Sequence, residues 1–169
     1  MKQTLKYILS LVMENLKIAE NKHGFILAIN SGLIVITVGF FNSEIKLVIF
    51  LNWLVILFAC ISIFFCFLGL FARNIKFLDK YKNPKHINLL YYKDVSTFSE
   101  LELIKCIIIS YGFPKDYVVD NFEKDLAREI IVNSKIAIKK YKLFNISVVF
   151  LMVALFLDVS LMAIMGFIS

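Results

Sequence analysis

The sequence predicts an all-α integral membrane protein with three transmembrane helices and cytosolic helical extensions. Of its 169 residues, 60% are hydrophobic and 17 are Phe, whereas soluble domains have roughly 45–50% apolar residues. The mean hydropathy is correspondingly high, at +0.79. Three long stretches are nearly free of charge and are long enough to cross a bilayer. Together these observations predict a membrane protein.

The distribution of basic residues predicts the orientation in the membrane. Four Lys lie in residues 1–23, one (Lys46) lies between the first two apolar stretches, and fourteen Lys or Arg lie in residues 73–142. Lys and Arg near membrane helices are retained on the cytoplasmic side. We therefore expect the N-terminus and residues 73–142 in the cytosol, and the loop 42–46 and the C-terminus outside.

Residues 1–23 are expected to form a cytosolic amphipathic helix. Apolar residues recur at three- and four-residue spacing over 4–22, which is typical of a helix with one apolar face. We expect this face to pack on another helix of the chain or of a neighbouring subunit. The alternative is a helix that lies on the inner leaflet, where Lys2, Lys6 and Lys17 would meet anionic headgroups.

Transmembrane helices 1 and 2 are predicted at residues 24–41 and 47–72, joined by a tight outside turn at 42–46. Asn30 lies in the first crossing, next to a Ser and a Gly, and Asn52 lies in the second. Small and polar residues inside a membrane usually let helices approach closely and hydrogen-bond. Helix packing is therefore the expected role of both Asn residues, with pore lining as the alternative for Asn30.

Residues 73–142 are predicted to form a cytosolic helical region. Its basic first part, 73–85, is expected to anchor the topology, with an anionic ligand as the alternative partner. The pattern Thr97-Phe-Ser-Glu100 is typical of a capping box and predicts a helix over about 98–111. Gly112-Phe113-Pro114 is expected to lead into one long helix from Pro114 to Ile168, because Pro is tolerated in a first helical turn.

Transmembrane helix 3 is predicted at residues 143–167, as the second half of that long helix. Asp158 is its one charged residue. A carboxylate inside a membrane usually faces a bundle interior or a water-filled cavity. We therefore interpret Asp158 as part of a membrane path or an oligomer contact, and Asn30 as a second candidate for this role. The alternative is that Asp158 is protonated or reaches the outer interface.

The sequence argues against catalysis, metal binding and nucleic-acid binding. His23 and His86 have no neighbouring Ser/Asp or Cys pattern, so no pair of nucleophile and base can be assembled. The three Cys have neither CxxC spacing nor a Cys/His cluster, and the scattered Gly form no phosphate-binding loop. The basic residues are mixed with acids near the membrane, unlike a nucleic-acid surface. We expect no enzyme activity, no metal and no cofactor.

Three segments resemble motifs of one family. Ala19-Glu20-Asn21-Lys22, ahead of a crossing that carries Asn30, is similar to the Ala-Asp/Glu-x-Lys motif of the Pycsar effector transmembrane family. The segment 88–95, which ends in Tyr92-Lys93-Asp94-Val95, resembles its Tyr/Phe-x-Asp-Ile segment. The run from Glu129 through Asn133-Ser134-Lys135-Ile136-Ala137 to Lys140-Tyr141 resembles its Ile…Asn/Ser-x-Ile-x-x-Lys-Tyr run. The three segments follow the family's order and cover most of the chain.

The resemblance implies an antiphage effector of the bacterial inner (plasma) membrane. In such a system a nucleotide cyclase makes a cyclic nucleotide, usually a cyclic pyrimidine mononucleotide, and the effector then disrupts the membrane. A cyclic nucleotide offers a flat base and an anionic phosphate, which aromatic rings and Lys or amide donors recognise. Residues of these types that we expect near the cytosolic membrane face are Asn21, Lys22, Tyr91, Tyr92, Lys93, Asn133, Lys135, Lys140 and Tyr141.

Asp94 is expected to pair with Lys22 or Lys140 and to hold the resting packing. For the whole set, the alternative to ligand binding is that these side chains only fasten the cytosolic helix ends together. With so few polar residues, three helices cannot enclose an aqueous path, so we expect a homo-oligomer in the lipid bilayer. The alternative function is a membrane-anchored adaptor that binds a protein partner through residues 86–142 without forming a pore.

Overall fold

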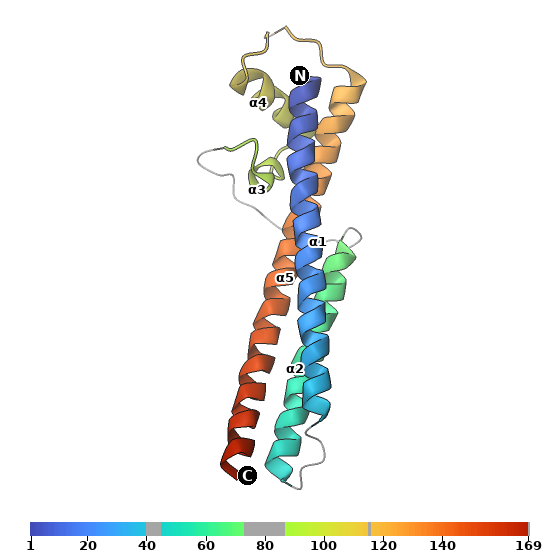
Figure 1. The fold of residues 1–169 in the computed structure, drawn as a ribbon. Helices are drawn as coiled ribbons and strands as arrows, with labels where there is room; N and C mark the ends of the chain where they lie inside the picture. Colours follow the sequence, from blue (N-terminus) through green and yellow to red (C-terminus); the bar gives the residue numbers. More distant parts are fainter. Residues whose placement is uncertain (40–44, 73–86, 115, 169) are drawn as a thin grey trace. The chain divides into compact units, whose positions relative to one another are not determined.

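A computed structural model describes residues 1–39, 45–72, 87–114 and 116–168. Of the described residues, 85% are helical and none lies in a strand. Three helices, α1, α2 and α5, are long and apolar enough to cross a membrane. The predicted all-α membrane protein with three such helices is confirmed. The helices are α1 (Lys2–Val38), α2 (Lys46–Leu70), α3 (Tyr92–Val95), α4 (Glu100–Ser110) and α5 (Asn121–Ile168) (Figure 1).

Two compact units make up the fold. Unit 1 consists of Met1–Ala19 and Ala72–Lys140, and unit 2 consists of Glu20–Phe71 and Tyr141–Ser169. Helices α1 and α5 are each continuous and contribute their N-terminal parts to unit 1 and their C-terminal parts to unit 2. The amphipathic helix predicted at residues 1–23 and the first crossing predicted at 24–41 thus belong to one continuous helix, α1.

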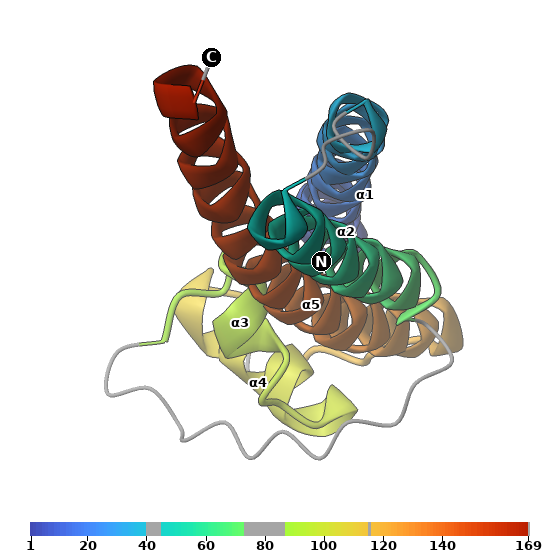
Figure 2. The same cartoon turned by 90° about the horizontal axis from the view of Figure 1, so that it is seen from below.

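Unit 2 is a bundle of α2 with parts of α1 and α5. The end of α1, the start of α2 and the end of α5 lie at the same end of this unit, which Figure 2 views from below. Its core combines small and branched side chains from all three helices, which lets the helices approach closely. The core residues are Ile26, Leu33, Val55, Ala59, Cys66, Leu151 and Ala154. Large side chains such as Phe25, Trp53 and Phe156 are exposed, as suits a surface that meets lipid.

Unit 1 has its own apolar core. The apolar face of α1 is buried here, from Leu5 to Ala19, so it packs within the chain. Helices α4 and α5 contribute further core residues at helical spacing, among them Leu103, Ile104, Ile107, Leu126, Ile130 and Ala137. Leu89, Tyr92 and Val95, in and just before α3, are buried as well.

The start of α4 differs from the prediction. Its capping box is formed by Ser99 and Glu102 rather than by Thr97 and Glu100. The backbone N–H of Ser99 donates to the Glu102 carboxylate at 2.7 Å, and the backbone N–H of Glu102 donates to the Ser99 hydroxyl at 3.4 Å. The Thr97 hydroxyl instead donates to the Asp94 carbonyl at 2.7 Å. Thr97 therefore belongs to the end of α3.

The predicted long helix from Pro114 is wrong at its start, because α5 begins at Asn121. Gly112 has a φ of +70°, and the N–H of Phe113 donates to the Ile108 carbonyl at 3.0 Å. This is a Schellman-type ending of α4, in which Gly adopts the left-handed conformation without strain. The Pro114 carbonyl then accepts the N–H of residue 117, so Pro114 lies in a turn.

Some predicted features lie outside the described residues. They are most of the turn at 42–46, the basic stretch at 73–85 and His86.

Candidate functional site

Tyr91, Tyr92 and Lys93 come together at the start of α3 in unit 1. The two rings meet edge to face with their centroids 5.2 Å apart, and Lys93 Nζ lies 5.8 Å from the Tyr91 centroid. Tyr92 is buried, whereas Tyr91 is 40% exposed. Tyr91 thus presents an accessible ring with an ammonium group beside it. Such a pair is suited to a flat, anionic ligand.

Asp94 helps to close the loop that leads to this pair. Its carboxylate accepts the backbone N–H of Asn88 at 3.0 Å, and the Asn88 side-chain oxygen accepts the N–H of Leu90 at 2.9 Å. The contact of this carboxylate is therefore local, and it helps to position Tyr91. Pairing of Asp94 with Lys22 or Lys140 stays a prediction.

Three further candidates of unit 1 lie on α5. Asn133 and Lys140 are seven residues apart and share a face of the helix, whereas Lys135 lies on the other side. The Asn133 amide donates to the Glu129 carboxylate at 3.0 Å. Lys135 is exposed, and Lys140 is buried at 4% exposure. In this packing Asn133 and Lys135 are accessible to a ligand, and Lys140 belongs to the interior of the unit.

The remaining candidates, Asn21, Lys22 and Tyr141, belong to unit 2. Lys22 Nζ lies 5.2 Å from the Tyr141 centroid and 5.5 Å from the Phe144 centroid, so cation–π attraction holds it over two rings. Asn21 is exposed. The nine ligand candidates thus form one set of six residues in unit 1 and one set of three in unit 2, and their joint use in one site stays a prediction.

A close contact in unit 2 was missed by the sequence reasoning, which treats His23 as an ordinary interfacial residue. His23 is fully buried, and its ring meets Phe144 edge to face at 5.8 Å between centroids. The ring also fills the space beside Gly69, where a Cβ would overlap the imidazole. A Gly inside an apolar helix is the signal that could have indicated such an approach.

Asn30 lies in the interior of unit 2, where it joins the three helices. Its amide nitrogen donates to the Ser62 hydroxyl at 2.9 Å and also to the Ile26 carbonyl at 2.9 Å. Ser62 in turn donates to the carbonyl of Ser147 at 2.8 Å. This buried chain connects α1 to α2 and α2 to α5.

Asp158 is also buried in unit 2, at 5% exposure. Its Oδ1 lies 3.4 Å from the Thr37 hydroxyl on α1. Asn52 on α2 is fully buried, and its amide has no hydrogen-bond partner among the described residues. The interior of unit 2 therefore contains a buried carboxyl group, a hydroxyl and an amide in addition to its apolar core.

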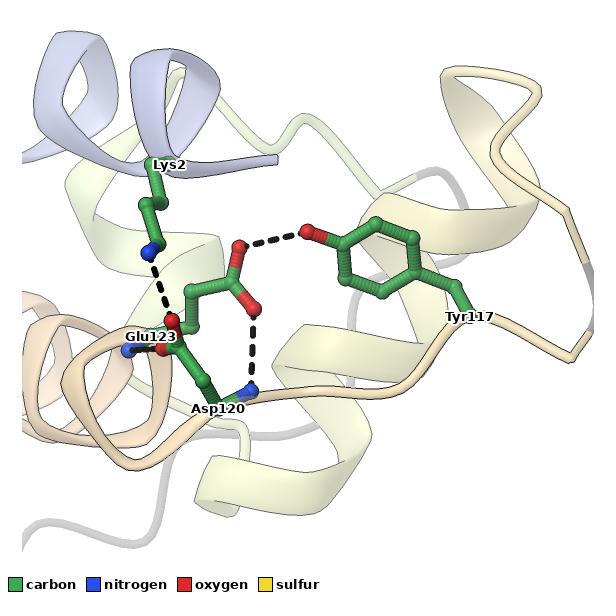
Figure 3. Close-up of polar contacts among 4 residues, drawn as sticks. All are labelled: Lys2, Tyr117, Asp120 and Glu123. Atoms are coloured by element: carbon green, nitrogen blue, oxygen red, sulfur yellow. Dashed lines mark hydrogen bonds and ion pairs between the residues drawn. The ribbon is translucent and has the colours of Figure 1, made fainter.

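A second feature missed from sequence is a polar cluster in unit 1 around the start of α5 (Figure 3). Lys2 Nζ lies 2.6 Å from the Asp120 carboxylate. The other Asp120 oxygen accepts the Glu123 N–H at 2.8 Å, and the Glu123 carboxylate accepts the Asp120 N–H at 3.2 Å. The Tyr117 hydroxyl donates to Glu123 at 2.8 Å. This reciprocal cap fixes the start of α5.

The cluster changes the acidity of three of its members. The hydrogen bond with Lys2 lowers the pKa of Asp120, and the hydrogen bond with Asp120 raises the pKa of Lys2. The hydrogen bond to the Glu123 carboxylate raises the pKa of Tyr117. The pair of Lys2 and Asp120 thus ties the first turn of α1 to the start of α5.

A family model described as the Pycsar effector protein domain matches residues 4–168. Because the match covers nearly the whole chain, the chain belongs to this family of transmembrane antiphage effectors. The resemblance seen in the three motifs is confirmed. A domain of this family is generally not an enzyme. Neither a curated protein nor a solved structure matches the chain.

Proposed function

We propose that this family member is a nucleotide-gated effector that disrupts the integrity or potential of the bacterial inner membrane as a homo-oligomer. Its signal is a cyclic nucleotide, with a cyclic pyrimidine mononucleotide favoured, supplied by a nucleotide cyclase of the same defence system. The N-terminus lies in the cytosol and the C-terminus outside. Membrane disruption ends the infection together with the infected cell.

The observation that carries the proposal is the exposed Tyr91 ring with Lys93 beside it, in a chain that belongs to an antiphage effector family. A pyrimidine ring stacks on Tyr91, and the cyclic phosphate meets the Lys93 ammonium group. Lys135 and Asn133 are accessible polar groups on opposite sides of α5, so one of the two can supply a further donor.

Coupling to the membrane follows from the continuity of two helices. Helices α1 and α5 both run from unit 1 into unit 2 without a break. A ligand that binds more tightly to one arrangement of unit 1 shifts the population toward that arrangement. A shift or rotation of α1 or α5 then changes the packing inside unit 2.

The path itself requires more than one copy of the chain. The interior of unit 2 is a packed core of small and branched side chains, which leaves the surfaces between copies as the place where a path forms. Asn30 and Asp158 are buried within a single chain. This favours a role in the path after repacking over a role as contacts between resting copies.

Calorimetric titration of the detergent-purified full chain tests the receptor function. Cyclic CMP and cyclic UMP are the ligands, and cyclic AMP and linear CMP are the controls. Replacement of Tyr91 by Ala should weaken binding about fivefold or more, because stacking of a base on an aromatic ring contributes about 1–3 kcal/mol. Tyr111→Ala is the matched control, since Tyr111 is also exposed, at 45%, but lies at the end of α4. Equal affinity of both variants would contradict the assignment.

Membrane potential in cells tests the effector function. Expression together with the signal nucleotide should depolarise the membrane, as read by a potential-sensitive dye. Tyr91→Ala should retain the potential, and Tyr111→Ala should lose it like the wild type. An intact potential despite confirmed expression and signal would count against a membrane-disrupting effector.

The adaptor alternative has one observation in its favour. Unit 1 exposes large apolar side chains, among them Leu101 at 63%, Ile109 at 80% and Val118 at 87%. Exposed apolar surface is typical of a protein interface. An adaptor would lose defence in Ile109→Lys while the membrane potential stayed intact in every variant, including the wild type with signal.

A further inference from the structure

The buried carboxyl group of Asp158 has no charged partner among the described residues. Along α1 no titratable side chain occurs from Gly24 to Gly39, and along α5 none other than Asp158 occurs from Leu143 to Gly166. On α2 the titratable groups are the thiols of Cys60 and Cys66, and Lys46 at its start is exposed. An ionised carboxylate without a cation is strongly unfavourable in such surroundings.

The geometry around Thr37 indicates that a proton on Asp158 neutralises the carboxylate. The Thr37 hydroxyl has one hydrogen and lies 2.8 Å from the Leu33 carbonyl and 3.4 Å from Asp158 Oδ1. The shorter contact uses that hydrogen, because a Thr in a helix commonly donates to the carbonyl four residues earlier. Toward Asp158 the hydroxyl then offers only an oxygen lone pair. A contact between two oxygens is favourable if Asp158 supplies the hydrogen.

Asn52 gives independent evidence for a polar site at this depth. It lies on the buried stripe of α2 that also carries Ser62, which contacts both other helices. Asn52 precedes Ser62 by ten residues, and Asp158 follows Ser147 by eleven. With a rise of about 1.5 Å per residue in antiparallel helices, Asn52 and Asp158 reach the same level. Both amide atoms of Asn52 are buried and without a partner among the described residues.

We propose that Asp158, Thr37 and Asn52 form a proton-binding site inside the membrane-spanning unit, with the proton on Asp158 in the resting packing. The Thr37 oxygen accepts the hydrogen of the acid, and the Asn52 amide, which has no partner among the described residues, can bind a water beside it. When water enters, the O–H bond of the acid breaks, the proton passes to water and a carboxylate remains. The protonation of Asp158 in the resting state is argued from the packing of unit 2 alone. In the opened path the carboxylate would favour cations over anions, and this second step rests in addition on the proposed function.

Infrared spectroscopy of the full chain in lipid bilayers at neutral pH, without any nucleotide, tests the resting protonation. A protonated carboxyl group has a C=O stretch that is separate from the carboxylate and amide bands. The wild type should show this acid band, and Asp158→Asn should lack it. Asp125→Asn is the matched control, because Asp125 is an exposed carboxylate of unit 1 with 70% side-chain exposure and its replacement should leave the band unchanged.

Two further spectra keep the test decisive. Isotope labelling of Asp at the carboxyl carbon should shift the acid band in the unmodified chain, which identifies it without any substitution. Thr37→Val should move the band to higher frequency, because the acid loses its acceptor. Absence of the band in the wild type, or its persistence in Asp158→Asn, would overturn the proposal. A band that appears only when Na⁺ is replaced by a large organic cation would show a bound metal ion instead of a proton and would also overturn it.

Discussion

The two units differ in the polar contacts that join their helices. In unit 2 the contacts between helices include buried groups, such as Asn30 with Ser62 and the His23 ring against Gly69. In unit 1 they include exposed ion pairs, namely Lys2 with Asp120 and Arg128 with Glu100. Water screens the contacts of unit 1, whereas shape and hydrogen bonding decide the packing of unit 2. The molecule should therefore be more sensitive to small changes in the interior of unit 2 than to loss of full charges in unit 1.

The largest effect that the comparison predicts comes from one methyl group. Gly69→Ala places a Cβ where the fully buried His23 ring lies, so α1 and α2 must separate or the ring must leave its site. Overpacking of this kind destabilises by about 1–3 kcal/mol. Thermal unfolding in detergent, followed by circular dichroism, measures the loss. Gly32→Ala is the control, because a Cβ at Gly32 meets nothing within 4 Å. Equal stability of Gly69→Ala and Gly32→Ala would show that the interior of unit 2 is not especially sensitive to small changes in packing.

A smaller loss is expected from the buried hydrogen bond between α1 and α2. Asn30→Leu removes the donor to Ser62 and should reduce the free energy of unfolding by about 0.6 kcal/mol, the average for hydrogen bonds between membrane helices, and by at most about 1.7 kcal/mol. Ser31→Ala is the matched control. The Ser31 hydroxyl is exposed and donates to the Leu27 carbonyl of its own helix, so its loss should change stability little. A Ser31→Ala effect as large as that of Asn30→Leu would show that the contact between helices is not the cause.

These differences also explain how far the sequence could be interpreted. The three membrane helices follow from long apolar stretches, which need no knowledge of packing. Asp158 stands out because a charge in such a stretch is rare. The contact of His23 with Gly69 could not be predicted, because it joins residues far apart in the chain and depends on how α1 and α2 pack.

The starts of α4 and α5 were predicted wrongly for a more local reason. The segment Thr97-Phe-Ser99-Glu100-Leu-Glu102 contains the capping pattern twice, offset by two residues, and the pattern alone does not distinguish the two. The structure uses Ser99 and Glu102 because the Thr97 hydroxyl is engaged by the end of α3. Asp120 and Glu123 have the same spacing and form the cap at the start of α5, whereas a Pro at 114 is also compatible with a first helical turn. The choice between the two caps depends on whether the end of α3 already uses the Thr97 hydroxyl, and the capping pattern alone does not contain that information.

A local effect is expected in unit 1 when the first turn of α1 is released. Lys2→Met removes the ion pair with Asp120, and hydrogen exchange should become several-fold faster in the first turn of α1 with little change elsewhere. Lys17→Met, on the exposed side of the same helix, is the control. Faster exchange throughout unit 1 would show that this pair stabilises more than a helix end.

The pH dependence of this effect has a definite sign. The pKa of Asp120 is lowered from its usual 3.8, so its contribution is complete above that value and is lost as the pH falls through the lower folded value. The pKa of Lys2 is raised from 10.5, so its contribution is complete below that value and is lost as the pH rises through the higher folded value. Lys2→Met and the wild type should therefore differ at neutral pH and converge in strong acid.

The smallest effect is expected for the pair of Arg128 and Glu100, which joins α5 to α4. The Arg128 guanidinium lies 3.2 Å from the Glu100 carboxylate, with 66% of the Arg side chain exposed. Exposed pairs contribute about 0.2–1 kcal/mol, and high salt screens that attraction. Arg128→Glu should lower the unfolding temperature of the full chain slightly at low salt, and Glu100→Arg in the same chain should restore it, because the pair is then reversed. A loss comparable to that of Gly69→Ala would mean that unit 1 depends on its charges as strongly as unit 2 depends on its packing.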